Sequence, residues 1–237
     1  MKTLVSLISL LAILLVALAG PLYKFSILDL GSAFSAISYG VYVGIASLVL
    51  LLIQVIFMRK NISWRAAGVS ALLAIIAVGL PVSMMSKASS VPAIHDISTD
   101  LVDPPKFVAV VALRADAPNP AEYPGEETAT QQREAYPELI TQKYSQTTKQ
   151  IFDILEAAVN TLGWELVNAD KTLGLIEATD TTAWFGFKDD VVIRIRTTGE
   201  ETLVDVRSKS RIGQSDLGKN AERIHTLINE VNVQLND

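Results

Sequence analysis

The sequence contains no cysteine and only two histidines, and charged residues make up 19% of its 237 positions. Without thiols the chain cannot form a disulfide scaffold, a zinc–thiolate centre or an iron–sulfur cluster, and thiol catalysis is excluded. The few charges are unevenly distributed. Residues 1–86 hold five basic residues and one acid, whereas residues 87–237 hold the other 15 basic and 24 acidic residues. This split predicts a membrane part followed by a water-soluble part.

Long stretches without any charge occupy the first part: Thr3 to Ala19, Gly40 to Met58 and Ala66 to Ser86. Each approaches the ~20 residues that cross about 30 Å of hydrocarbon at 1.5 Å per residue. Residues 1–86 are therefore predicted to be a membrane anchor with three transmembrane helices, at about 3–23, 38–58 and 66–86, and the lipid bilayer is the first expected partner. No ionisable residue lies mid-span, which disfavours a transporter.

The connection between the second and third stretches carries Arg59, Lys60 and Arg65. Because short cytoplasmic loops are enriched in basic residues, we predict that this connection is cytoplasmic. The chain is then a multi-pass protein of the cell inner membrane, with a cytoplasmic N-terminus and a periplasmic or otherwise extracytoplasmic C-terminal domain. The bulk acidity of that domain argues against a nucleic-acid partner, because such binding rests on clustered basic residues.

The first stretch has a second interpretation. Lys2, the apolar run and the small residues Ala17 and Ala19 before Gly20 also resemble a secretory signal peptide with its cleavage site. The run is long for a signal peptide, so a retained helix is favoured. Both alternatives leave the C-terminal domain outside the cytoplasm.

The soluble part divides into a Pro-rich linker and N-terminal arm, residues 87–138, and a soluble α+β domain, residues 139–237. Lys106 to Leu113 is an apolar run of strand type, and Ala115 to Thr130 is expected to be a surface loop. In the domain, apolar periodicity predicts a helix capped by Ser145 and a second helix opened by Ser215 or Asp216. The four strand-like runs between them are Trp164–Val167, Leu173–Ala178, Val191–Arg196 and Leu203–Arg211. The expected fold is an antiparallel sheet of four or five strands with two amphipathic helices on one face.

Strand alternation indicates which side chains point away from those helices. Because successive residues of a strand face opposite sides, the apolar set led by Val191 and Val204 faces the helices. The other face then carries a concentration of basic residues with acids beside them: Arg194, Arg196, Asp205, Arg207, Lys209 and Arg211.

Two runs in this region resemble a known family: Phe185 to Arg196, and Asp205 to Ile224 with the pattern D-x-R-S-x-S-R-x-G-x-S-D-x-G-x-N-A. Together with the upstream segment Ile94 to Asp100, they are similar to the domain-of-unknown-function family catalogued as number 1499, over about residues 92–233. The membrane helices lie outside this resemblance. It implies a recurrent domain of bacteria and plant plastids, and it supplies no reaction, substrate or cofactor.

The arginines offer planar forks of donors that suit a phosphate or carboxylate. The candidate ligand-binding residues are Arg194, Arg196, Asp205, Arg207, Arg211, Asn220 and His95. The alternative is that the arginines pair with neighbouring acids across strands and serve only the fold. Both interpretations stay open from the sequence.

The leading hypothesis is a membrane-anchored extracytoplasmic binding or scaffold domain for an anionic ligand or a partner protein, with no catalytic residue, metal or cofactor. A hydrolase or metal-dependent enzyme using His95, Asp96 or Asp100 is the first alternative, and a structural membrane-assembly subunit is the second. Ser208 and Ser210 point toward the helices by parity, which disfavours a serine nucleophile. Asp189 and Asp190 point to opposite faces, which disfavours a shared metal ligand. The oligomeric state is left open.

Overall fold

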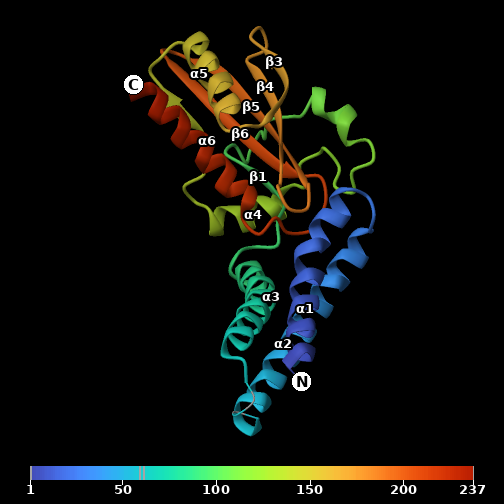
Figure 1. The fold of residues 1–237 in the computed structure, drawn as a ribbon. Coiled ribbons are helices and arrows are strands. Elements are labelled where there is room, and N and C mark those ends of the chain that lie inside the picture. Colours follow the sequence, from blue (N-terminus) through green and yellow to red (C-terminus); the bar gives the residue numbers. More distant parts are fainter. Residues whose placement is uncertain (1, 59, 61, 237) are drawn as a thin grey trace. The chain divides into compact units, whose positions relative to one another are not determined.

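The structure is a computed structural model that describes residues 2–58, 60 and 62–236, so Arg59 of the basic connection lies outside the described residues. The chain divides into two compact units (Figure 1). The helical unit comprises Met1–Lys87 together with Ala183–Gly186, and the sheet unit comprises Ala88–Thr182 and Phe187–Asp237.

Three long helices form the helical unit: α1 (Lys2–Lys24), α2 (Leu30–Phe57) and α3 (Trp64–Ser90). All three are long and apolar enough to cross a membrane. Large apolar side chains on each helix are turned outward, such as Leu7, Leu52 and Leu72 at 61%, 59% and 58% exposed. In water such surfaces would be unfavourable, so their exposure indicates contact with lipid. The prediction of three apolar N-terminal helices is confirmed.

Glycines let the helices approach closely. A Cβ on Gly40 would lie 2.6 Å from Cγ2 of Val16 in α1, and a Cβ on Gly44 would lie 2.9 Å from Cγ2 of Val78 in α3. The two glycines thus make room for two different neighbouring helices, α1 and α3. They are used for packing within the chain.

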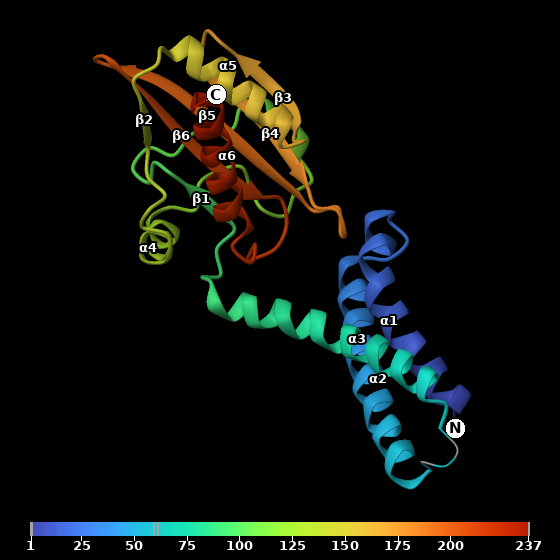
Figure 2. The ribbon, with the colours of Figure 1, turned by 60° about the vertical axis from the view of Figure 1, so that its left-hand side comes forward.

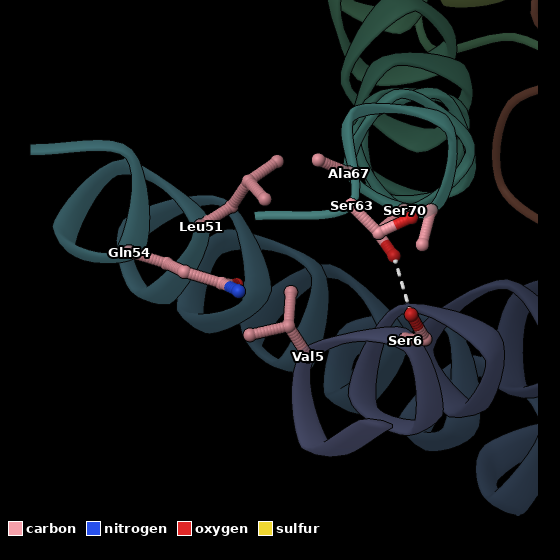
Figure 3. A pocket seen from close by; sticks show the side chains of 8 residues that line it. Val5, Ser6, Leu51, Gln54, Ser63, Ala67 and Ser70 are labelled. Atoms are coloured by element: carbon pink, nitrogen blue, oxygen red, sulfur yellow. Dashed lines mark hydrogen bonds between the residues drawn. The ribbon is translucent and has the colours of Figure 1, made fainter. Parts of the chain in front are cut away.

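Gln54, a polar residue of the second apolar stretch, is 5% exposed and points into a small cavity between the helices (Figure 3). The cavity measures about 10 Å³, which is room for about one water molecule. Across it, the hydroxyls of Ser6 and Ser70 hydrogen-bond at 3.0 Å and join α1 to α3. Its walls hold no ionisable side chain among the described residues, and we assign it a packing role.

The sheet unit is built on a six-stranded antiparallel sheet in the order β1-β6-β5-β4-β3, with β2 also paired to β6. The helices α5 and α6 lie on one face of it (Figure 2). The strands are β1 (Asp96–Ser98), β2 (Gln142–Tyr144), β3 (Glu165–Asp170), β4 (Leu175–Thr181), β5 (Lys188–Thr198) and β6 (Glu201–Ser210); the helices are η2 (Ala109–Arg114), α4 (Glu126–Ala135), α5 (Thr148–Thr161) and α6 (Lys219–Asn236). The predicted α+β fold with two helices on one face is confirmed.

The main core fills the space between the sheet and the two helices. Ile193 and Val206, partners across β5 and β6, pack there with Leu155 of α5 and Leu227 of α6, and all four are at most 1% exposed. Burial of these side chains stabilises the domain by roughly 1.5–3 kcal/mol each. The apolar parity of the two strands is as predicted.

The arm that precedes the domain differs from its prediction. The expected strand from Lys106 to Leu113 is wrong: the described backbone forms the 3₁₀ helix η2 there. The carboxylate of Glu177 in β4 accepts the N–H groups of Val108 and Ala109, each at 2.7 Å. A negative charge at a helix start satisfies unpaired N–H groups, and it favours a helical turn here.

Two shorter elements also depart from expectation. The predicted surface loop from Ala115 to Thr130 ends early, because α4 begins at Glu126. The cap of α5 is Thr147 rather than Ser145, and it forms a reciprocal capping box with Gln150. The helix α2 begins at Leu30, capped by Asp29, and so starts before the predicted residue 38. The edge pairing of β1 and β2 with β6 also differs, because local apolar periodicity did not indicate it.

Candidate functional site

The sheet face opposite α5 and α6 carries a layer of charged side chains that we call the ionic layer. It is formed by Asp190, Arg194 and Arg196 of β5, Asp205, Arg207 and Lys209 of β6, Asp96 of β1, Glu177 of β4, and Arg211, which follows β6 directly. The part of the arm from Asp100 to Glu122 lies against this face and supplies Asp100, Asp103 and Arg114. The layer consists of three clusters, each centred on a carboxylate that is fully excluded from solvent.

The arginines of the Asp205 cluster are the most exposed to solvent of the three clusters. One oxygen of Asp205 accepts bonds from Arg194 at 3.0 Å and from Arg196 at 2.6 Å, and the other accepts the hydroxyl of Thr141 at 2.6 Å. Asp100 of the arm contacts both guanidinium groups, at 3.0 and 3.3 Å. Both arginines are partly open to solvent, with 19% and 39% of their side chains exposed.

The side chains of the Asp96 cluster are almost fully buried. The guanidinium of Arg207 donates two parallel bonds to the Asp96 carboxylate, at 2.9 and 2.8 Å, and the ammonium of Lys209 lies 3.0 Å from the same group. Phe107 covers the guanidinium at 4.8 Å from its ring centroid, which adds a cation–π contact. Burial lowers the pKa of Lys209 below its usual value, and attraction to Asp96 partly opposes this effect.

Tyr123 closes the same cluster from the arm, with its ring 5.4 Å from the Arg207 guanidinium. Burial, aided by the negative charge of Asp96, raises the pKa of Tyr123 to about 12. The phenol is therefore held in its neutral form, so it is no candidate for a base near neutral pH.

The Asp190 cluster joins the arm to the end of the sheet. Asp190 accepts bonds from Arg211 at 2.8 and 2.9 Å, from Arg114 at 2.6 Å and from the Thr179 hydroxyl at 2.7 Å. Burial disfavours its charge, but the hydrogen bonds from Arg211, Thr179 and Arg114 and the Arg211 charge outweigh burial, so the pKa of Asp190 lies below its usual range. The carboxylate is therefore fully ionised near neutral pH.

Asn220 lies in the first turn of α6, on the other face of the sheet, and connects α6 to β6 and to the segment before β1. Its side-chain oxygen accepts bonds from the Ser208 hydroxyl and the Arg223 guanidinium, both at 2.7 Å. Its amide nitrogen donates to the Ser210 hydroxyl at 3.1 Å and to the backbone oxygen of His95 at 3.0 Å. Every polar atom of this buried amide is thus used, as a fully excluded polar side chain requires.

The seven candidate ligand residues therefore do not surround one site. Arg194, Arg196 and Asp205 lie together, while Arg207 and Arg211 belong to the other two clusters. Asn220 is separated from them by the sheet, and the ring Nδ1 of His95 lies 3.3 Å from the backbone oxygen of Gln214. Within the described residues, no group of three or more His, Asp or Glu side chains is placed to hold a metal ion.

Sequence reasoning missed Arg114, Phe107 and Arg223 as parts of these networks. Arg223 of α6 bridges Asp180 and Asp189, at 2.8 and 2.7 Å, on the helix side of the sheet. Its place inside an otherwise apolar helix face was the available signal. Arg114 and Phe107 lie in the arm, and nothing local indicated which strands they would contact.

One turn of the arm stands out at the open end of the layer. The Asp100 carboxylate accepts the N–H groups of Val102 and Asp103, each at 3.0 Å, which fixes a tight turn. Arg194 holds Asp103 from the sheet, with bonds to its carboxylate and to its backbone oxygen, both at 2.8 Å. Val102 stands at the tip of this turn with 97% of its surface exposed.

Comparison with known families gave one finding. Residues 96–231 match the model of a family described as "Protein of unknown function (DUF1499)", which is more than half of the chain. None of the curated proteins matches. The matched span contains the ionic layer, the arm from residue 96 onward and Asn220 itself, and it excludes the three apolar helices.

Proposed function

Since the chain belongs to the DUF1499 family, whose function is unknown, its role has to be argued from its own surface, and we propose that it is a membrane-anchored, extracytoplasmic binding or scaffold protein. The proposed ligand is a partner protein. The proposed contact surface, which we call the Arg196 edge, consists of Asp100, Val102, Asp103, Arg194 and Arg196.

The observation that carries the proposal is the exposure of Val102 on a fixed turn beside charges of both signs. Asp100 and Arg194 hold the turn in one conformation, so little entropy is lost when a partner covers it. Next to Val102, the Asp103 side chain is 67% exposed and the Arg196 side chain is 39% exposed. A partner protein that covers Val102 can pair its own charged groups with Asp103 and Arg196, and such charge complementarity sets the specificity of an interface.

A small anion suits this surface less well. The Asp205 cluster contains three carboxylates and two guanidinium groups, so an added anion would meet an excess of negative charge. The arginines of the other two clusters are already held by Asp96 and Asp190 and are largely buried. A protein can offer an acid to Arg196 and a base to Asp103 at the same time.

Photo-crosslinking in the native membrane tests the proposal. A photoreactive amino acid at Val102 should give a discrete adduct with another polypeptide, and one at Val233 of α6, which is 55% exposed, serves as the control. Arg196→Ala should abolish the adduct. Arg133→Ala, which removes a more exposed arginine from α4, should not. If Val102 reacts no more specifically than Val233, the proposed surface is wrong.

Titration of the purified full chain with inorganic phosphate and pyrophosphate separates the two kinds of ligand. We expect no saturable binding at the Arg196 edge. If wild-type protein binds either anion and Arg196→Ala abolishes that binding, the result supports a small anionic ligand instead of a partner protein. Asp205 keeps Arg194 and Thr141 as partners in that variant, so the fold should be retained.

Because the chain has no cysteine, single introduced cysteines can test the proposed membrane topology. Single cysteines at Ile27, between α1 and α2, and at Lys60, between α2 and α3, can be labelled with a membrane-impermeant thiol reagent in intact cells. Residue 27 should react from outside, and residue 60 only after permeabilisation. The reverse pattern would place the sheet unit in the cytoplasm, since an even number of spans separates residue 27 from residue 88.

A further inference from the structure

The helix α1 contains a gap in its own hydrogen bonding near its C-terminal end. In a regular helix the oxygen of Ala17 would accept the N–H of residue 21, but Pro21 has no N–H to donate. A carbonyl without a partner is costly in or near the hydrocarbon region, and neighbouring groups normally satisfy it. The structure supplies that group from a distant part of the sequence.

The indole nitrogen of Trp184 donates to the Ala17 oxygen at 3.1 Å. The ring reaches this position because residue 20 is a glycine: a Cβ there would lie 2.6 Å from Cδ1 of Trp184. Pro21 and Gly20 thus create, in adjacent positions, the unsatisfied acceptor and the space for the donor ring. Both features belong to the same compact unit as Trp184 itself.

The residues on either side of Trp184 add two further contacts. Phe185 is 5% exposed and packs against Tyr23 of α1 and Phe34 of α2, with ring centroids 5.8 and 5.7 Å apart. Lys24 donates to the backbone oxygen of Ala183 at 3.3 Å. Aromatic pairs of this kind stabilise a contact beyond the area that they bury.

We infer that Ala183–Gly186 is a clasp that binds the C-terminal end of α1. We also infer that α1 is retained in the mature protein as a membrane span and is not a signal peptide removed after Ala19. Cleavage at that position would separate the Ala17 acceptor from Gly20 and would destroy the Trp184 site. The small residue at position 19 is explained by helix packing, since Ala19 is fully buried. Ala17 takes part in the contact through its backbone oxygen. The inference is independent of the proposed function.

An engineered cross-link tests the clasp, because the chain has no cysteine of its own. A Cβ on Gly186 would lie 3.5 Å from Cβ of Lys24, which falls within the range of roughly 3.5–4.5 Å seen in disulfides. Mild oxidation of the full chain carrying Lys24→Cys and Gly186→Cys should protect both thiols from a maleimide. The control pair, Lys24→Cys with Trp64→Cys, should leave both thiols reactive, because α3 begins at Trp64 and its Ser70 contacts Ser6 near the opposite end of α1. Equal protection of the two pairs, or protection of neither, would overturn the clasp.

Two point variants test the role of the hydrogen bond. Trp184→Phe keeps a ring but removes the donor, and Pro21→Ala gives Ala17 a donor within α1, so each should lower the cross-link yield severalfold. Trp64→Phe, which changes an exposed tryptophan on α3, should leave the yield unchanged. Unchanged yields in the first two variants would show that the indole bond does not hold the clasp.

The mass of the mature wild-type protein isolated from membranes tests the retention of α1. We expect residues 2–19 to be present in the mature chain. A mature chain that begins at Gly20 would overturn this part of the inference, whatever the cross-link shows.

Discussion

The carboxylate of Asp96, in the first strand of the sheet unit, accepts two parallel hydrogen bonds from the guanidinium of Arg207, and at most 2% of either side chain is exposed. The two residues are 111 positions apart in the sequence. Their pairing attaches the arm to the sheet at the edge where β1 joins β6. Arg207 of the motif therefore stabilises the folded domain, and this role does not depend on a ligand.

Removal of Arg207 should be strongly destabilising. Arg207→Met should lower the free energy of unfolding by about 3–5 kcal/mol, because breaking a buried pair leaves an uncompensated charge. Lys209→Met should cost less, since Asp96 keeps both bonds from Arg207. Urea unfolding of the full chain in detergent checks this, with Trp164 as the reporter after Trp64→Phe and Trp184→Phe. Equal losses in the two variants would contradict the assigned role of the bidentate pair.

Asn220 should contribute to stability through the hydrogen bonds of a neutral side chain and not through an ion pair. Asn220→Ala leaves Ser208, Ser210 and Arg223 without their common partner, and a buried polar group without a partner costs roughly 1–3 kcal/mol. We expect a loss of at least about 2 kcal/mol by the same urea assay. Asn232→Ala, on the exposed side of α6, should change stability by no more than about 0.5 kcal/mol. If both variants unfold at the same urea concentration, Asn220 is not a structural hub.

The sequence predicts much of the fold because local periodicity carries it. The three apolar stretches, the two amphipathic helices and the parity of β5 and β6 all follow from spacings of two to four residues. That parity correctly assigned Arg194, Arg196 and Arg207 to the face away from the helices, and Ser208 to the face toward them. Residues on a strand can therefore be assigned to a face without a structure.

The partners of those residues were not predictable in the same way. Asp96 pairs with Arg207 across 111 positions of the sequence. Glu177 accepts N–H groups at the start of η2 across at least 67 positions. No local pattern specifies such a pairing. The run from Lys106 to Leu113 reads as a strand by composition, and the distant Glu177 carboxylate is what favours the helical turn. The sequence also did not show that the charged sheet face is covered, because no local pattern in the arm indicates that it packs there.

Acid should weaken the sheet unit through Asp190. Its pKa is lower in the folded protein than the ordinary value of 3.8, so ionised Asp190 stabilises the fold above that value. This contribution is lost as the pH falls below about 3.8 and through the folded pKa. Asp190→Asn should therefore cost about 3 kcal/mol at pH 7, where Arg114 and Arg211 lose their counterion, and the difference from wild type should shrink toward pH 2.

The urea assay at pH 7, 4 and 2.5 measures that difference directly. Asp116→Asn is the matched control, because Asp116 is an exposed acid in the segment that follows η2. Its variant should follow the wild-type curve at every pH. A difference for Asp190→Asn that stays constant with pH would show that ionisation of Asp190 does not contribute to stability.

Two glycines with the same backbone conformation should respond very differently to a methyl group. Gly174 and Gly199 have φ angles of +62° and +61°, so alanine is strained at both by about 1–2 kcal/mol. At Gly174 a Cβ would also lie 2.3 Å from the backbone oxygen of Ile195, whereas at Gly199 it would meet nothing within 4 Å. The Ile195 N–H donates to the Gly174 oxygen at 2.7 Å, so neither backbone can move aside without losing that bond. Gly174→Ala should therefore cost about 1–3 kcal/mol more than Gly199→Ala in the urea assay, and equal losses would mean that the strand end yields freely.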